Sequence, residues 1–236
     1  MVRRLNGEPP EIRQAAKAWF GGLAAVAVLV IAMRIIGTLP LYFPPNFERG
    51  FLRDRQAYFW SSGYGVGFYV HIIGAPLALV CGLLQFSRLL LLWSPRLHRL
   101  LGRTYALAVL LAAAPGGFVM GLRSFAGAPA LLCFTVMSLL VSMFTLLAWR
   151  DAVRRRFAAH RRWMIRSYLM MVSAVLLRLI DPLLRDFGVP DMQSYVWSLW
   201  LSWVPSLLIF EAAERWPVWK KTLKFHRSLA ETSKSS

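Results

Sequence analysis

The sequence predicts an all-α fold, a bundle of six transmembrane helices with both termini on the cytoplasmic side. Hydrophobic residues make up 57% of the 236 residues and charged residues only 17%, whereas soluble domains carry about 45–50% and roughly 25%. Six separate apolar stretches each approach the roughly 20 residues that a helix needs to cross a bilayer core. The basic residues are also distributed unevenly among the connections between these stretches. Together these observations exclude disordered, collagen-like and disulfide-stapled classes.

The six stretches are interpreted as helices because an open strand in lipid would leave its backbone groups without hydrogen-bond partners. They cover Ala18–Leu39, Tyr64–Phe86, Thr104–Met120, Pro129–Trp149, Met164–Leu183 and Tyr195–Ala213. No small-residue cleavage site follows the first stretch, so we expect a signal anchor. The third stretch is the shortest and contains Pro115, which removes a helix hydrogen bond, so a kink is expected there.

The basic residues predict the orientation. With the N-terminus inside, the cytoplasmic segments hold 21 of the 28 Lys and Arg residues, and the outer loops hold 5. The positive-inside rule favours this topology, so the net charge of +17 does not indicate nucleic-acid binding. We therefore expect a cytoplasmic N-terminal segment (1–17), a six-span membrane domain (18–213) and a basic cytoplasmic tail (214–236). The tail either lies on the anionic inner leaflet or is solvated.

Small and polar residues repeat at helical spacing in several spans and predict the faces that point into the bundle. In the second span these residues are Gly67, His71, Gly74, Ala78, Gly82 and Gln85. The fourth, fifth and sixth spans carry similar rows, which contain serine and threonine. The first span lacks such a row, so we expect it at the periphery of a core formed by spans two to five.

Ionisable residues at membrane depth are costly, so each is a candidate for function. The candidates toward the outer side are His71, Arg178 and Asp181. One hypothesis is a binding site for an anionic or carbonyl-bearing ligand, such as a quinone headgroup. The alternative is structural, with Arg178 paired to Asp181 and His71 bonded to a backbone carbonyl.

A second group of candidates lies at the predicted inner ends of two spans. His98, Arg99 and Arg103 open the third span, and His160, Arg161 and Arg166 open the fifth. Helix N-termini favour anions, so a phosphate headgroup, a haem propionate or an acidic loop of a partner would suit these positions. Alternatively, the arginines follow the positive-inside rule and the histidines cap helices.

The sequence contains no phosphate-binding glycine loop, no His-Glu-x-x-His and no Gly-x-Ser-x-Gly motif. The leading hypothesis is therefore a membrane component that binds a lipid or quinone-like ligand, or serves as an accessory subunit of a larger membrane complex. The second is an electron-transfer protein with one b-type haem between His98 and His160. A transporter is the third. Cys81 and Cys133 both lie within spans and offer no metal-binding spacing.

Several motifs together resemble a known family. They are 71–74 (HIIG), 81–86 (CGLLQF), 98–105 (HRLLGRTY), 160–167 (HRRWMIRS), Arg178 and 200–205 (WLSWVP). This ordered set, over about residues 64–215, resembles domain-of-unknown-function family 2306, a group of predicted polytopic membrane proteins that are mainly bacterial. The resemblance implies a multi-pass protein of the bacterial cytoplasmic membrane and supplies no reaction. Ser206 stands where the family usually carries Asn, which implies a weaker polar contact on the sixth span.

Overall fold

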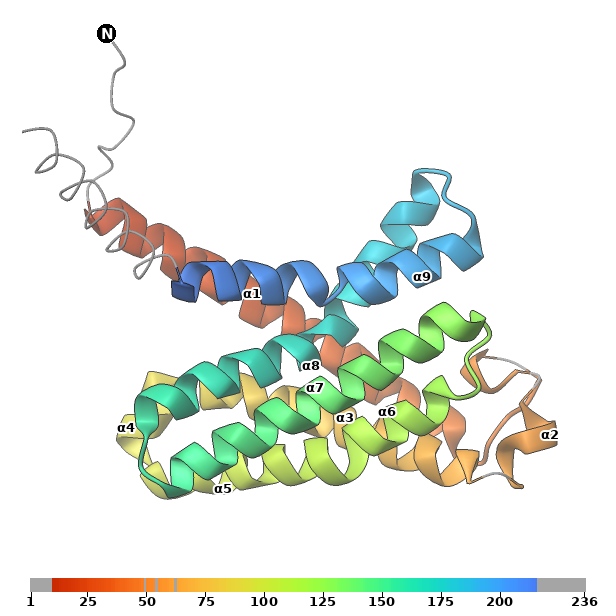
Figure 1. Ribbon diagram of the computed structural model, residues 1–236, viewed down its shortest axis with the longest axis horizontal. Coiled ribbons are helices and arrows are strands. Elements are labelled where there is room, and N and C mark those ends of the chain that lie inside the picture. The colour runs from red at the N-terminus through yellow and green to blue at the C-terminus, as the bar shows by residue number, and fades with distance from the viewer. Residues whose placement is uncertain (1–9, 49, 54, 62, 216–236) are drawn as a thin grey trace, which may run out of the picture. The chain divides into compact units, whose positions relative to one another are not determined.

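The computed structural model describes residues 10–48, 50–53, 55–61 and 63–215, which form helices and connections without a strand (Figure 1). Six helical segments in this part of the chain are long and apolar enough to cross a membrane. They are Gly21–Tyr42, Tyr64–Gln85, Pro95–Gly121, Gly127–Val153, Phe157–Asp186 and Asp191–Arg215. The prediction of an all-α protein with six spans is therefore confirmed, and the first span is the least buried of the six.

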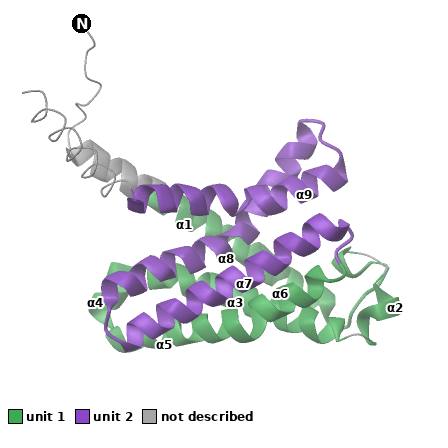
Figure 2. Cartoon of the chain, viewed as in Figure 1, with its two compact units in different colours: residues 1–123 green, residues 124–236 purple. Residues whose placement is uncertain are grey.

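The chain divides into two compact units, residues 1–123 and 124–236 (Figure 2). The helical elements of unit 1 are α1 (Pro10–Thr38), η1 (Leu39–Tyr42), η2 (Gly50–Leu52), α2 (Gln56–Phe59), α3 (Tyr64–Gln85), α4 (Arg88–Trp93), α5 (Pro95–Ala108), η3 (Val109–Ala113) and α6 (Ala114–Gly121). Those of unit 2 are α7 (Gly127–Val153), α8 (Phe157–Asp186), α9 (Asp191–Leu201) and the helical residues 204–215. Most of the predicted basic tail, 214–236, lies outside the described residues, as does the start of the predicted segment 1–17.

The third span is longer than predicted. Its helix begins at Pro95, where Ser94 caps the N-terminus by accepting a hydrogen bond from the backbone N–H of Leu97 (3.3 Å). Proline suits the first helical position because its missing N–H would have no partner there. The prediction that the third span is the shortest of the six was wrong. The arginines of α5 lower the local hydropathy, but they do not end the helix.

The irregularity expected at Pro115 takes the form of a π-helical turn. This turn, η3, comes directly before α6, and the N–H of Ala114 bonds the carbonyl of Val109 five residues earlier. Proline has no N–H to offer the preceding turn, and its ring crowds that turn's carbonyl, so the backbone widens. The third span therefore continues through the proline to Gly121.

α3 is the centre of unit 1, where it packs against α1, α5, η3 and α6. Its small residues allow close approach: a Cβ on Gly67 would meet Val119, and one on Gly74 would meet Ala112. On the facing helix, a Cβ on Gly116 would lie 2.5 Å from the carbonyl oxygen of Gly67. The row of small residues predicted for the second span is thus buried against the third, as small-residue packing in membranes requires.

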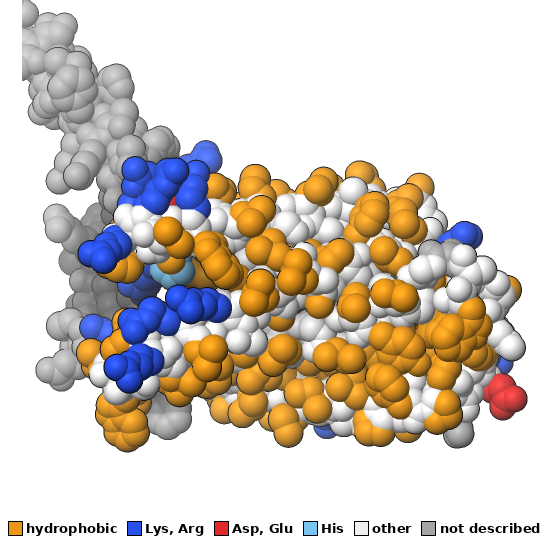
Figure 3. Space-filling model, turned by 90° about the horizontal axis from the view of Figure 1, so that it is seen from below, with side chains coloured by type: hydrophobic (Ala, Val, Ile, Leu, Met, Phe, Trp, Pro, Cys, Tyr) orange, Lys and Arg blue, Asp and Glu red, His pale blue; other side chains and the backbone are white. Residues whose placement is uncertain are grey.

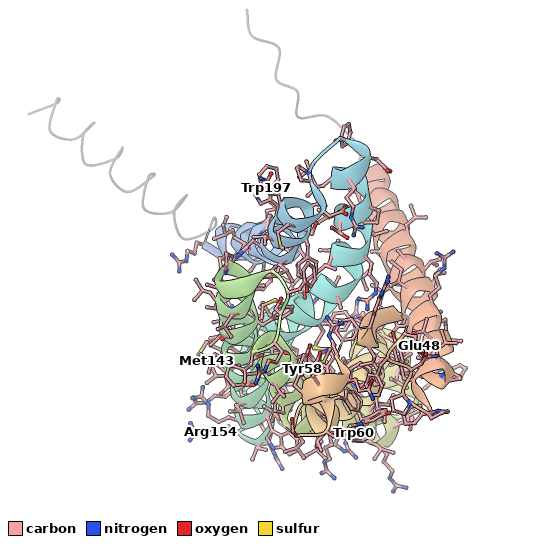
Figure 4. All side chains as sticks on the ribbon, turned by 90° about the vertical axis from the view of Figure 1, so that its right-hand side faces the viewer. Glu48, Tyr58, Trp60, Met143, Arg154 and Trp197 are labelled. Carbon is pink, nitrogen blue, oxygen red and sulfur yellow. The ribbon has the colours of Figure 1, made fainter. Side chains whose placement is uncertain are left out.

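The segment between α1 and α3 folds into an aromatic cluster at one end of unit 1. Leu52, Phe59, Tyr64 and Phe68 form its buried centre. The hydroxyl of Tyr69 donates to the carbonyl of Tyr42 (2.9 Å), which ties the segment to α3. Tyr58 and Trp60, labelled in Figure 4, belong to the same segment.

Unit 2 is held by α8, which packs along α7 and against α9. Thr145 and Ser167 share a buried hydrogen bond of 2.7 Å between their hydroxyl oxygens. The indole N–H of Trp203 donates to the Sγ of Cys133 (3.4 Å), which joins the sixth span to α7. Serines 194, 198 and 202 are buried along one face of the sixth span. The row predicted for the sixth span therefore points inward. In the fifth span Ser167 and Asp181 are buried, whereas Arg178, which was predicted to share their face, is exposed.

Candidate functional site

Asp181 lies near the end of α8 and is buried. Its carboxylate forms an ion pair with Arg185, one helical turn onward, and accepts a hydrogen bond from the hydroxyl of Ser194 (2.8 Å). Because Ser194 belongs to α9, the contact joins the two helices across their connection. The buried carboxylate thus has a structural role in unit 2.

Arg178 lies one turn before Asp181 on the same helix. Its Nη1 donates to the carbonyl oxygen of Ala174 (2.8 Å). Helical side chains lean toward the N-terminus, so Arg178 extends away from Asp181 while Arg185 leans back toward it. The structural alternative was therefore right to expect a pair at Asp181, but the arginine in its ion pair is Arg185.

His71 lies in unit 1, on the face of α3 that meets the third span. Its Nδ1 is 2.8 Å from the carbonyl oxygen of Ala113, the last residue of the π-helical turn. A Cβ on Gly117 would lie 3.2 Å from the ring, so glycine leaves the space that the imidazole occupies. The backbone contact expected in the structural alternative is therefore present. A joint ligand site of His71 with Arg178 and Asp181 remains a prediction.

His98, Arg99 and Arg103 lie on α5. The backbone carbonyl of His98 accepts a hydrogen bond from Nε2 of Gln85 (3.0 Å), which connects the ends of α3 and α5. Arg99 and Arg103 are exposed, and no carboxylate among the described residues forms an ion pair with them. Both arginines therefore extend outward from unit 1.

His160 and Arg161 lie in the first turns of α8. His160 Nδ1 is 2.8 Å from the carbonyl oxygen of Ala148 on α7, which fixes the ring between the two helices. Arg161 is exposed. The imidazole of His160 is thus held in place by α7, whereas the guanidinium of Arg161 faces outward.

Arg166, the third predicted ligand residue of α8, is engaged within unit 2. Its Nε and Nη2 bind the two carboxylate oxygens of Glu211 at 2.5 and 3.0 Å. Its guanidinium carbon lies 4.7 Å from the ring centroid of Trp163 and 5.0 Å from that of Phe210. Arg166 therefore holds the helical residues 204–215 against α8, in a site built by chain contacts.

Sequence reasoning did not single out the connection between α7 and α8. We call Arg154, Arg155 and Arg156, which connect the two helices, the arginine turn. All three side chains are exposed, and the described carboxylates form no ion pair with any of them. Figure 3 shows Lys and Arg side chains at its left-hand end, where Figure 1 places this connection, and Arg154 is labelled in Figure 4.

The backbone of the arginine turn is well defined. The N–H groups of Arg155 and Arg156 bond the carbonyls of Ala152 (3.0 Å) and Asp151 (2.8 Å), which closes the end of α7. Arg155 has a φ of 57°, a left-handed conformation that usually carries glycine at a helix end. The sequence signal was the run of three arginines, which the positive-inside rule had already explained.

A family model described as predicted membrane protein of unknown function (DUF2306) matches residues 68–213. The chain belongs to this family. No curated protein and no solved structure matches it. Membership agrees with the resemblance drawn from the motifs and with the six spans of the structure.

The match to the DUF2306 family begins within α3, so it includes every candidate residue named above and leaves out the first span. Within the described part of the chain, no three His, Cys, Asp or Glu residues are placed to hold a metal ion. Cys81 and Cys133 are buried free thiols. The polar features within the matched residues are thus helix-joining contacts and outward-facing arginines.

Proposed function

We propose that this multi-pass membrane protein binds the phosphate of an anionic lipid headgroup at the arginine turn, on the cytoplasmic face of the bacterial inner membrane. The observation that carries the proposal is the set of three exposed guanidinium groups that no described carboxylate pairs, at the shared end of two apolar spans. An accessory subunit that delivers or retains such a lipid is the corresponding role in a larger complex.

The chemistry of the site favours a phosphate. A guanidinium presents a planar fork of N–H donors that matches two phosphate oxygens, and it stays charged at any physiological pH. The arginine turn connects α7 and α8, which are 27 and 30 residues long. Helices of that length exceed the hydrocarbon core, so we expect their common end at the level of the lipid headgroups.

Preorganisation supports the same proposal. The hydrogen bonds that close α7 set the backbone of Arg154–Arg156 before any ligand binds. Asp151, the nearest carboxylate in sequence, is buried and paired with Arg150. The neighbouring acid is thus already satisfied, and the positive charge of the arginine turn faces outward undiminished.

The test is lipid binding to a triple variant. Replacing Arg154, Arg155 and Arg156 with glutamine removes three charges, each worth about 1 kcal/mol at an anionic surface. We expect affinity for phosphatidylglycerol to fall about a hundredfold, which corresponds to about 3 kcal/mol. Native mass spectrometry of the full chain, titrated with phosphatidylglycerol and phosphatidylcholine, measures the change.

The matched control replaces the same three arginines with lysine, which retains the charge but lacks the planar fork. If the lysine variant binds with near wild-type affinity, charge alone accounts for the binding. An intermediate loss of affinity would show that the geometry of the guanidinium groups contributes as well. Equal binding by the glutamine and wild-type proteins would refute the proposal, provided that both show the same thermal unfolding midpoint.

A second candidate function is electron transfer through one haem, favoured by the orientation of His160. An imidazole whose Nδ1 donates to a backbone carbonyl, as His160 does to Ala148, directs Nε2 toward a ligand. A haem reading predicts a Soret band that sharpens on addition of dithionite and disappears in His160→Ala while the protein stays folded. A colourless protein purified from haem-supplemented cells would contradict it.

A further inference from the structure

The connection between α3 and α5 contains α4, a short helix with the sequence RLLLLW. Its apolar side chains face outward: Leu89 is 71% exposed, Leu92 75% and Trp93 89%. The connection between α7 and α8, in contrast, presents three consecutive arginines. The connection between α7 and α8 is thus basic throughout, whereas that between α3 and α5 carries four consecutive leucines and a tryptophan.

α4 is a built element with defined ends. The hydroxyl of Ser87 accepts from the N–H of Leu90 (3.2 Å) and caps its N-terminus. The N–H of Ser94 bonds the carbonyl of Leu90 (3.0 Å), and its side chain then caps α5. These two caps fix where α4 begins and where it ends.

Gln85 sets the position of this element from the α3 side. Its Nε2 donates to the carbonyl of His98, and a Cβ on Gly102 would lie 3.1 Å from its Oε1. The amide therefore fills the space that glycine leaves on α5. α4 is consequently held between two helices whose ends are joined directly.

Basic residues flank the apolar surface. Arg88 precedes it, and Arg96, Arg99 and Arg103 follow on α5 at spacings of three and four, which define one face of a helix. All four are exposed, and none forms an ion pair with a carboxylate of the described residues. Leucine and tryptophan beside unpaired arginines is the composition of helices that lie in the interface of an anionic bilayer.

We propose that α4 is an interfacial anchor that lies in the plane of the membrane, with Leu89, Leu92 and Trp93 among the upper acyl carbons and the flanking arginines on the phosphates of anionic lipids. Its occupant is the bilayer that α3 and α5 enter. Charge selects lipid over a protein groove, because an apolar groove would leave the adjacent guanidinium groups without counter-charge. The inference is independent of the arginine turn, since it concerns residues of unit 1.

The experiment measures the depth of a probe on α4 in the full chain. Trp93→Cys, labelled with the fluorophore NBD, is placed at one copy per nanodisc of phosphatidylcholine with phosphatidylglycerol. The native Cys81 and Cys133 are buried, which directs the label to the new thiol. Arg154→Cys on the other connection is the matched control. Acrylamide quenches probes in water, and lipids with a nitroxide near the top of the acyl chain quench probes in the interface.

At position 93 we expect a blue-shifted emission, quenching by acrylamide several-fold weaker than at position 154, and quenching by nitroxide lipids several-fold stronger. Acrylamide quenching at position 93 as strong as that of free NBD-labelled cysteine in buffer would place α4 in water and overturn the proposal. Protection from acrylamide without nitroxide quenching would overturn it too, because it would place α4 against protein.

A second variant tests the part played by charge. Replacing Arg88, Arg96 and Arg99 with glutamine in the Trp93→Cys background leaves the apolar face intact. We expect nitroxide quenching at position 93 to fall in discs that contain phosphatidylglycerol and to change little in pure phosphatidylcholine. If quenching is unchanged in both lipids, the anionic headgroups do not help to anchor α4, and that part of the proposal is wrong.

Discussion

Arg166→Met is expected to lower the stability of unit 2 by about 2 kcal/mol, between the values for exposed and for fully buried ion pairs. The Arg166 side chain is 13% exposed and that of Glu211 is 28% exposed, so the change leaves a partly buried carboxylate without its partner. The variant also loses two cation–π contacts. The measurement is the thermal unfolding midpoint in a mild detergent, followed by scanning fluorimetry.

Arg162→Met is the matched control on the same helix. Its ion pair with Glu214 spans 3.6 Å between side chains that are 54% and 34% exposed, and such pairs contribute about 0–1 kcal/mol. The double variant Arg166→Met with Glu211→Met should recover part of the loss, because it removes the stranded charge. Indistinguishable midpoints for Arg166→Met and Arg162→Met would disprove the interpretation that partial burial makes the Arg166–Glu211 pair the stronger of the two.

Gly116→Ala is expected to destabilise unit 1, although alanine is the better helix former. The new Cβ would lie 2.5 Å from the backbone oxygen of Gly67 and 2.8 Å from the Cβ of His71, so α3 and α6 must separate. Overpacking of this kind costs about 1–3 kcal/mol and outweighs the gain in helix propensity of about 1 kcal/mol. The same thermal measurement reports it.

Gly22→Ala supplies the comparison for the steric effect. Gly22 lies in α1, and no atom comes within 4 Å of a Cβ built there. The propensity gain is then unopposed, so the midpoint should rise or stay constant. If both variants shift the midpoint in the same direction, the close contact between α3 and α6 is absent in solution.

Hydropathy and residue spacing were sufficient to predict the six spans and the inward rows of small and polar residues. Both signals reflect how whole helices are exposed to lipid, and each is averaged over many residues. The start of α5 was missed because the averaging signal weakens where Arg96, Arg99 and Arg103 share a helix with leucine. The Ser94–Pro95 pair was the local signal for that start, since serine caps a helix and proline suits its first position.

The partners of polar side chains were harder to predict than the spans. Asp181 has arginines on both sides along α8, and only the direction in which helical side chains lean explains why Arg185 forms the ion pair. Arg166 and Glu211 are 45 residues apart, so no local pattern connects them. The arginine turn was not recognised as a candidate site. The positive-inside rule already explains why basic residues occur there, and it makes no reference to their geometry.

The π-helical turn η3 also constrains how related chains can be aligned. Its hydrogen bonds reach back five residues, so the stretch holds one residue more than an α-helical turn would need. Each residue turns an α-helix by about 100°. A relative that lacks this one residue would therefore rotate everything beyond it, and Gly116 and Gly117 would no longer face α3. In family members that keep this helix packing, we expect the number of residues between His71 and the glycine pair to vary. The variation should occur only before the π-helical turn, where the connections are exposed.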